Sequence, residues 1–242
     1  MQFGISILSI VPVRSEPNDR SEMTTQLIFG EHYKILETIK RWSKIQIAHD
    51  KYVGWISNKQ IKKINIDEYE KLEKEVPTLT TDILDIIEAD YNQPIVMGSV
   101  LPTFKSDHAL INNKMYKFTG NKTQGYSQKD HLINNAMVYL NSPYRWGGRT
   151  PFGIDCSGFT QIIYRLQGMK IPRDAYQQIE IGRDIDLSNS EAGDLAFFEN
   201  KSGKITHVGI ILENEKIIHA SGHVRIDKLD KNGIFNLEKQ KY

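Results

Sequence analysis

The sequence contains a single cysteine among its 242 residues. One thiol excludes an internal disulfide framework and any zinc site built from several cysteines, and it is typical of a chain in a reducing compartment. No apolar run approaches the roughly 20 residues that a membrane-spanning helix needs. Lys plus Arg (31) nearly balance Asp plus Glu (30), so the charge gives no reason to expect nucleic acid or a membrane as a partner.

The first residues also lack the features of a signal peptide. No Lys or Arg precedes the apolar run Ile5–Val11, and no small-residue cleavage site follows it. We expect this segment to be a β-strand bounded by Pro12. We therefore predict a cytoplasmic protein.

Two stretches of short apolar runs come first. Residues 1–65 hold five strand-like runs about ten residues apart, a spacing that predicts a small antiparallel barrel. The segment from Gln60 to Val76 is dense in Lys and Glu and predicts a solvated linker or a short helix. Residues 77–122 then repeat the texture of the first stretch and predict a second small β module, so residues 66–122 comprise the linker and this module.

Residues 123–242 have a different pattern. The segment SQKDHLINNAMVYL has apolar residues at helical spacing: Leu132, Ala136, Met137 and Leu140. The segment DCSGFTQIIYRLQG has a second such set, followed by Gly168 as a stop: Phe159, Ile162, Ile163 and Leu166. Three strand candidates follow, namely DLAFFE, THVGIIL and KIIHAS. Helices packed on an antiparallel sheet give an α+β domain.

Cys156 lies where this second helix begins. Asp155 is a suitable N-cap, which places Cys156 in the first turn. Free backbone N–H groups and the helix dipole at that end favour a thiolate, so we expect a lowered pKa. We also expect Gly158 to keep the helix slim for a substrate. Taken alone, a single cysteine is more often a small buried core residue.

Two histidines lie in neighbouring strand candidates. A hairpin turn centred on Glu213 would place His207 directly opposite His219, close enough for one imidazole to act as base and the other to orient it. Each histidine alone is more often a hydrogen-bonded strand residue. A zinc site from Cys156, His207, His219 and a water is a further alternative, although no fourth protein ligand is evident.

The runs YRWGGRTPFGIDCSGFTQIIY, GDLAFF, THVGIIL and IIHAS together resemble the NlpC/P60 cysteine peptidases, over roughly residues 127–235. The resemblance implies a papain-like α+β core in which Cys156 is the nucleophile, His207 the general base and His219 the residue that orients it. Tyr144 matches the tyrosine beside the oxyanion in this family. No metal or organic cofactor is implied.

The two β modules ahead of this domain resemble bacterial SH3 (SH3b) domains. The whole arrangement resembles endopeptidases that cleave the γ-D-glutamyl-L-diamino acid bond of peptidoglycan peptides during murein recycling. That resemblance implies a partner that is a short peptidoglycan-derived peptide with a free N-terminal L-Ala. Asp174 would bind its ammonium group, and Tyr52 with Glu22 would reach it from the first SH3b domain, with Glu31 as the alternative to Glu22.

Four further residues fall on positions that line the groove of the family. Asp155 and Ser157 flank the cysteine, and Asp155 serves equally well as an N-cap. Trp146 would be a pocket wall or a packing anchor. Arg173 would bind a substrate carboxylate or pair with a nearby acid.

Two other functions fit the same sequence. A wall-lytic endopeptidase would use its SH3b modules to hold intact peptidoglycan, and the missing export features argue against it. A non-catalytic protein that binds murein peptides would not need Cys156, His207 and His219. The sequence indicates neither the oligomeric state nor whether the diamino acid is meso-diaminopimelate or lysine.

Overall fold

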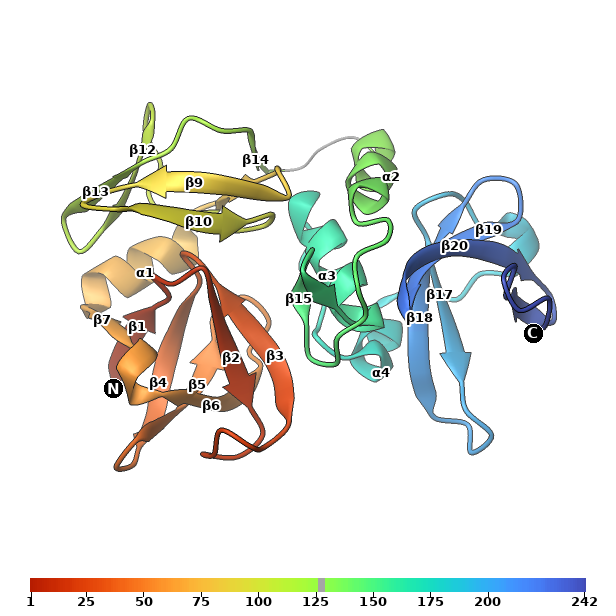
Figure 1. Ribbon diagram of the computed structural model, residues 1–242, viewed down its shortest axis with the longest axis horizontal. Helices are drawn as coiled ribbons and strands as arrows, with labels where there is room; N and C mark the ends of the chain where they lie inside the picture. The colour runs from red at the N-terminus through yellow and green to blue at the C-terminus, as the bar shows by residue number, and fades with distance from the viewer. Residues whose placement is uncertain (126–128) are drawn as a thin grey trace. The chain divides into compact units, whose positions relative to one another are not determined.

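The computed structural model describes residues 1–125 and 129–242, and the side chains of Lys129 and Asp130 lie outside the description. The chain forms two compact units, Met1–Tyr126 and Ser127–Tyr242, and each is described by itself (Figure 1). Across the described residues, none of the helices combines the length and the apolar character that crossing a membrane requires.

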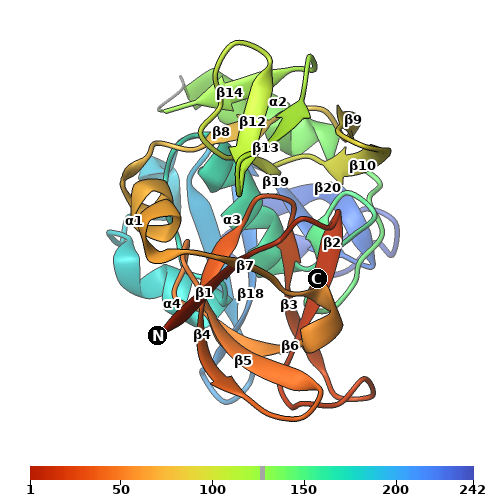
Figure 2. The ribbon, with the colours of Figure 1, turned by 90° about the vertical axis from the view of Figure 1, so that its left-hand side faces the viewer.

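The first unit begins with a seven-stranded antiparallel sheet, in which β4, β5 and β6 are consecutive neighbours (Figure 2). In spatial order its strands are β3 (Met23–Ile28), β2 (Ile10–Arg14), β6 (Val53–Ser57), β5 (Trp42–Ile47), β4 (His32–Thr38), β1 (Gln2–Ile5) and β7 (Lys62–Ile64). Alternate residues of β2 and β5 are buried, as expected for strands with one face on a core. The expected strand at the start of the chain is two strands. Pro12 lies inside β2, between the buried Val11 and Val13, and does not end it.

The Lys- and Glu-rich segment after this sheet carries a helix. The 3-10 turn η1 (Asn58–Gln60) leads into the segment, which holds β7 and α1 (Ile66–Lys74). Asn65 caps α1 by accepting a hydrogen bond from the amide of Glu68 at 2.8 Å. Tyr69 and Leu72 are buried, so the segment contributes to the core of the unit and is not only a solvated linker.

Two smaller sheets complete the first unit. One contains β10 (Asn92–Val96), β9 (Leu84–Glu88), β13 (Lys114–Lys117) and β12 (His108–Ile111), and the other contains β11 (Val100–Leu101), β8 (Thr78–Thr80) and β14 (Lys122–Gln124). One cluster of buried side chains joins Phe3 and Phe29 to Leu101 and Phe118. The amide of Val100 also donates a 2.8 Å hydrogen bond to the carbonyl of Phe29. The stretches 1–65 and 66–122 therefore share a core. The identification of the second as an SH3b module stays a prediction.

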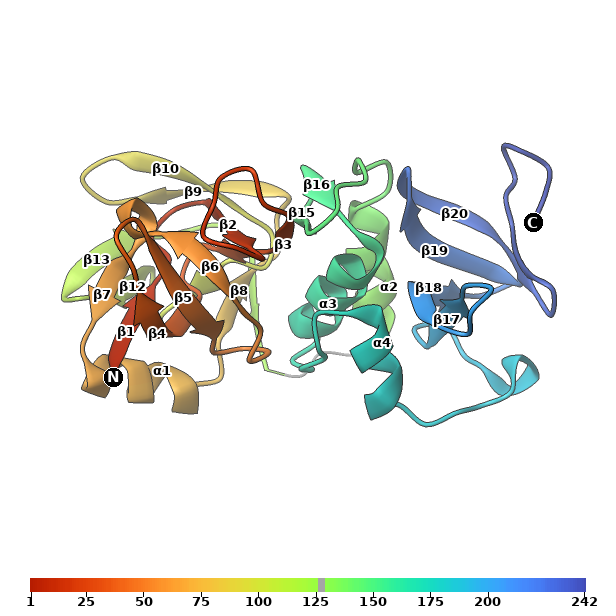
Figure 3. The same ribbon diagram turned by 90° about the horizontal axis from the view of Figure 1, so that it is seen from below.

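The second unit is α+β. Its five-stranded antiparallel sheet has the order β17 (Leu195–Glu199), β18 (Ile205–Leu212), β19 (Lys216–Ser221), β20 (His223–Asp230) and β21 (Gly233–Phe235). Its remaining elements are α2 (Lys129–Val138), β15 (Arg149–Thr150), β16 (Gly153–Ile154), α3 (Cys156–Leu166), α4 (Ala175–Gln178) and the 3-10 turns η2 (Ile179–Ile181) and η3 (Leu187–Asn189). Helix α3 packs against β18 and β19, and α2 packs against α3 (Figure 3).

The end of α3 confirms the predicted stop. Gly168 has a φ of +78°, and its amide donates to the carbonyl of Arg165 at 2.9 Å. The amide of Met169 donates to the carbonyl of Tyr164 at 3.0 Å. This is a Schellman motif, which requires a left-handed residue where the glycine stands.

The buried face of α2 differs from the prediction. Leu132 and Ala136 are buried as expected, but Met137 and Leu140 are 39% and 38% exposed. The helix ends at Val138, and the tighter turn that follows places Tyr139 in the core instead. Its ring meets that of Phe159 edge to face, with centroids 5.8 Å apart.

Candidate active site

Asp155 holds the loop before α3 against the start of the helix. One of its carboxylate oxygens accepts a hydrogen bond from the amide of Gly158 at 2.7 Å, which confirms the predicted N-cap. The other accepts from the amide of Gly147 at 2.8 Å. Cys156 follows as the first residue of the helix and is 7% exposed.

Gly158 has a different role from the one expected. A Cβ atom on Gly158 would lie 2.3 Å from the carbonyl oxygen of Gly148 and 3.0 Å from the carboxylate of Asp155. The missing side chain therefore makes room for the loop that precedes the helix. It does not open a path for a substrate.

Arg173 joins the residues on both sides of the cysteine. Its guanidinium donates two hydrogen bonds to the Asp155 carboxylate, at 2.6 and 3.0 Å, and a third to the Ser157 hydroxyl at 2.8 Å. Arg173 is 1% exposed. Of the two roles considered for it, the structure shows the ion pair with an acid. Because a buried guanidinium needs a carboxylate partner, this pair fixes the backbone on either side of Cys156.

The surroundings of Cys156 do not favour a thiolate in the free protein. Burial raises the pKa of the Cys156 thiol to about 11, and the Asp155 carboxylate acts in the same direction. The backbone amides of Val208 and Ser157 and the charge of Arg173 act the other way, but more weakly. The expected low pKa at the helix start is therefore wrong, because desolvation of the anion exceeds the stabilisation by backbone N–H groups.

His207 and His219 are hydrogen-bonded, with 2.7 Å between His207 Nε2 and His219 Nδ1. The predicted register is wrong by two residues, since Ile210 pairs with Ile218 and Leu212 with Lys216, which centres the turn on Asn214. A shift of two residues keeps both side chains on the same face of the sheet, so the imidazoles meet diagonally. A Cβ on Gly209 would lie 2.9 Å from the Cβ of His219, so this glycine leaves the space that His219 occupies.

Two further residues extend this pair along the sheet. Asp227 on β20 accepts a hydrogen bond from His219, with 3.1 Å between Oδ2 and Nε2. Arg225 pairs directly with His219 across the two strands and donates to Asp227 Oδ1 at 3.0 Å. Neither residue was predicted from the sequence. The available signal was HVRIDKLD, in which oppositely charged residues two positions apart follow the histidine strand.

Both histidines are neutral at neutral pH. Burial lowers the pKa of His207 to about 4, and the neighbouring His219 adds to this. Burial also lowers the pKa of His219, although Asp227 opposes it. Burial acts to raise the pKa of Asp227, but hydrogen bonds from Arg225, the Leu237 amide and His219 hold that pKa below its usual value. The set is thus one carboxylate with two uncharged imidazoles.

Three other predicted residues lie in the same unit. Tyr144 is partly buried, and burial together with the nearby Cys156 raises the pKa of its hydroxyl to about 12, so the phenol stays protonated and can donate a hydrogen bond. Trp146 is 63% exposed. Asp174 begins α4, where its side chain and that of Gln177 form a capping box.

The remaining predicted residues belong to the first unit. Tyr52 is partly buried and packs against the core of the seven-stranded sheet. Glu22 is exposed, in the loop before β3. Glu31 is buried, and its carboxylate accepts a hydrogen bond from the amide of Ile28 at 2.9 Å. Of these two glutamates, only Glu22 is therefore open to solvent.

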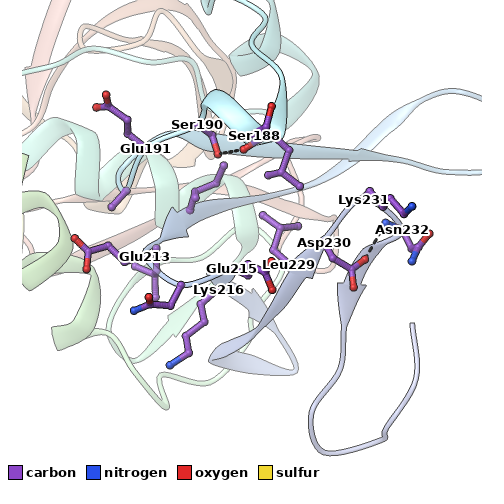
Figure 4. Close-up of a pocket in the computed structure, with 15 residues that line it drawn as sticks. Ser188, Ser190, Glu191, Glu213, Glu215, Lys216, Leu229, Asp230, Lys231 and Asn232 are labelled. Carbon is purple, nitrogen blue, oxygen red and sulfur yellow. Dashed lines mark hydrogen bonds between the residues drawn. The ribbon is translucent and has the colours of Figure 1, made fainter.

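A groove of about 960 Å³ lies at the hairpin end of β18 and β19 and contains none of the predicted site residues. Figure 4 shows acidic and basic side chains around it, among them Glu213 and Lys216. Within the part of the chain that the structure describes, no group of three or more His, Cys, Asp and Glu side chains is arranged to hold a metal ion. Zinc ligation by Cys156 with the two histidines therefore gains no support.

Models of two known protein families match the chain, one in each of its two units. The model of the NlpC/P60 family matches residues 141–237, a span that contains Cys156, His207, His219 and Asp227. Residues 13–61 match a bacterial dipeptidyl-peptidase SH3 domain, which identifies the first module as SH3-like.

Several proteins of known name resemble this chain in sequence or in fold. A gamma-D-glutamyl-L-lysine dipeptidyl-peptidase of Bacillus cereus is 28% identical over 226 residues, which cover 83% of this chain and 68% of the relative. A protein of the same name from Bacillus subtilis is 41% identical over 93 residues, which cover 38% of this chain and 31% of the relative. An NlpC/P60 family protein from Bacillus cereus has the same fold, with a TM-score of 0.85, 22% identity and coverage of 96% and 95% of the two chains.

Taken together, the domain and these relatives support a hydrolase that acts on peptidoglycan peptides.

Proposed function

We propose that this protein is a cysteine peptidase that cleaves the γ-D-glutamyl-L-diamino acid bond of short, free peptidoglycan stem peptides. The observation that carries the proposal is the start of α3 beside β18. It combines a buried thiol at the first position of a helix with a hydrogen-bonded histidine pair inside an NlpC/P60 domain. The names of the relatives supply the bond type.

In the first step, the thiol of Cys156 passes its proton to His207 as the sulfur attacks the substrate. The sulfur attacks the γ-carbonyl carbon of the D-glutamyl residue and forms a tetrahedral intermediate. The first-turn amide of Cys156 and the hydroxyl of Tyr144 stabilise the oxyanion, and one such donor typically contributes about 3 kcal/mol. His207 then protonates the leaving amine of the diamino acid, and a thioester remains.

Water completes the cycle. His207, now neutral again, accepts a proton from water as the oxygen attacks the thioester carbonyl. The second tetrahedral intermediate collapses, the carbon–sulfur bond breaks, and the proton returns to the thiol of Cys156. The products are L-Ala-γ-D-Glu and a peptide or amino acid that begins with the diamino acid.

We extend the proposal to the recognition of the substrate. Asp174 binds the free ammonium group of the N-terminal L-Ala, because an ammonium taken out of water needs a carboxylate. Tyr52 and Glu22 contribute to substrate binding from the first SH3-like module. Trp146 forms an apolar wall beside the cysteine.

Mass spectrometry of the products from a panel of stem peptides tests the reaction. We expect L-Ala-γ-D-Glu from the free tripeptide L-Ala-γ-D-Glu-L-diamino acid with the wild-type protein and none with Cys156→Ala. We expect at least a 100-fold lower kcat/KM on the N-acetylated tripeptide, since acetylation removes the charge that Asp174 binds. Equal turnover of free and acetylated peptides would contradict the role of Asp174.

The same panel separates the alternatives. Release of fragments from intact, cross-linked peptidoglycan at the rate of the free peptide would indicate a wall-lytic enzyme. Peptide binding in calorimetry with no product from any peptide would indicate a binding protein. Either result would overturn the proposal.

A further inference from the structure

The hydrogen-bond chain that starts at Asp227 determines which nitrogen atoms of the two histidines carry protons. We infer that Asp227 is a positioning residue that fixes both imidazoles as Nε2–H tautomers and so leaves Nδ1 of His207 as the proton-accepting nitrogen. This inference rests on the proposed peptidase function, and it concerns a residue that does not touch the substrate.

The tautomers follow from a count of donors and acceptors. The Asp227 carboxylate can only accept, so its hydrogen bond with His219 Nε2 requires a proton on Nε2. His219 is neutral, so its Nδ1 then carries a lone pair and accepts. Its partner at 2.7 Å is His207 Nε2, which must therefore be the donor. His207 is neutral as well, so its Nδ1 carries the lone pair that a general base needs.

Asp227 is held in one orientation from the side away from His219. Its Oδ1 accepts from Arg225 Nη2 at 3.0 Å and from the amide of Leu237 at 2.9 Å. Arg225 is itself fixed by Glu238, at 2.8 Å, and by Asn236, at 3.0 Å. Asp227 is fully buried, so water does not replace these donors. Its Oδ2, which also lies 2.8 Å from Arg225 Nε, is therefore the atom presented to His219.

An asparagine at position 227 would exchange donor and acceptor in each hydrogen bond from residue 227 through His219 to His207. The Leu237 amide and Arg225 Nη2 at the Oδ1 position can only donate, whereas His219 can change tautomer, so the carbonyl oxygen of Asn is expected to lie at the Oδ1 position. The NH2 group then faces His219 Nε2, on the side where Arg225 Nε lies 2.8 Å from Oδ2 in the wild type. An NH2 group is a donor, which forces His219 into the Nδ1–H tautomer. His219 would then donate to His207 Nε2 and leave the proton of His207 on Nδ1, where the base needs a lone pair.

The comparison of Asp227→Asn with Asp227→Ala separates this role from a structural one. Alanine removes the acceptor and leaves Arg225 with fewer partners, so a structural role predicts that Ala is the more damaging change. The tautomer role predicts that Asn, the better isostere, is at least as damaging to turnover. The expected loss in kcat for Asn is about 10²- to 10⁴-fold, in line with the wrong-tautomer effect in a serine protease triad.

Steady-state kinetics on the free tripeptide gives the first measurement. We expect a lower kcat with an unchanged KM for Asp227→Asn, together with a thermal midpoint close to that of the wild type. Asp230→Asn, the same exchange farther along β20, is the matched control and should keep wild-type kcat. Full activity of Asp227→Asn, or an Ala variant that is clearly the less active of the two, would overturn the inference.

Nitrogen-15 NMR of the histidine rings gives the second measurement and does not depend on activity. The wild type should show Nε2–H for both His207 and His219, and Asp227→Asn should show Nδ1–H for both. Should the wild type turn over no peptide but show these patterns, the proposed function fails and the tautomer chain stands. Unchanged ring tautomers in Asp227→Asn would contradict the inferred role of Asp227, whether or not the variant is active.

Discussion

Cys156 and His207 are both uncharged in the free protein. Burial raises the pKa of the thiol to about 11 and lowers that of the imidazole to about 4, so at neutral pH neither group is ionised. A preformed thiolate–imidazolium pair would require the opposite order of the two values. We therefore expect proton transfer to accompany the attack on the carbonyl and not to precede it.

The first prediction concerns the pH dependence of kcat/KM. A base with a pKa near 4 is lost as pH falls through that value, so activity should decline below about pH 5 and stay level from there to about pH 9. Alkylation of Cys156 by iodoacetamide should accelerate only as pH approaches 11, where the thiolate forms. A bell-shaped profile with a basic limb below pH 8 would show that the ion pair exists in the free enzyme.

Cys156, Asp155 and the two histidines could be proposed from short local patterns, whereas the other candidates followed only from the resemblance to the NlpC/P60 peptidases. The DCSG segment contains both the cap and the nucleophile, and the two histidines lie in strands that were themselves predicted. Asp227 could not be found in this way, because its role depends on the pairing of β19 with a strand that had not been predicted. The partner of Arg173 likewise depends on a contact between residues far apart in the chain.

At the level of elements, the loop that contains Gly147 and Gly148 lies close against the first turn of α3. Gly158→Ala should lower the free energy of unfolding by about 1–3 kcal/mol, although Ala favours a helix, because its Cβ would lie 2.3 Å from a backbone oxygen. Gly182→Ala is the control, since its nearest neighbour would lie 3.9 Å away, and we expect it to change stability by less than about 1 kcal/mol.

Chemical denaturation of the two glycine variants provides the measurement. Equal stability of Gly158→Ala and the wild type would mean that the loop shifts without cost. In that case the variant should also keep full activity, since the position of Cys156 would not depend on the contact.

For the second unit, the positions of the strands in the sequence were predicted more accurately than the register in which they pair. The run THVGIIL corresponds to β18, but the turn after it is centred on Asn214 and not on Glu213. Asn214 and Glu215 both have positive φ values, 59° and 55°, and a glutamate gives no signal for that conformation. Hydrophobic alternation therefore located the strands, whereas turn geometry, which the sequence hardly indicates, set how they pair.

For the whole molecule, the shared core of the first unit has a consequence for folding. Phe29 belongs to the same buried cluster as Leu101 and Phe118, and a Cβ on Gly30 would lie 2.1 Å from the carbonyl oxygen of Val100. A fragment of residues 1–65 would expose this apolar surface. We predict that it does not fold cooperatively, whereas a fragment of residues 1–125 does.

Circular dichroism and amide NMR dispersion of the two fragments test this prediction. A sigmoidal unfolding transition in the fragment 1–65, with dispersed amide signals, would show that the first stretch is an independent domain. The sequence suggested a boundary near residue 65 because the texture repeats there. Apolar texture does not reveal that two modules bury their faces against each other.

The contacts of Arg225 and Asp227 with residues 236–238 also bear on the order in which a ribosome produces the site. The nucleophile and both histidines leave the exit tunnel before Asn236, Leu237 and Glu238 do. Until those residues emerge, Arg225 lacks its partners Asn236 and Glu238, and Asp227 lacks the hydrogen bond from the Leu237 amide. Vectorial synthesis would thus leave the orientation of this carboxylate incomplete until residues 236–238 have emerged.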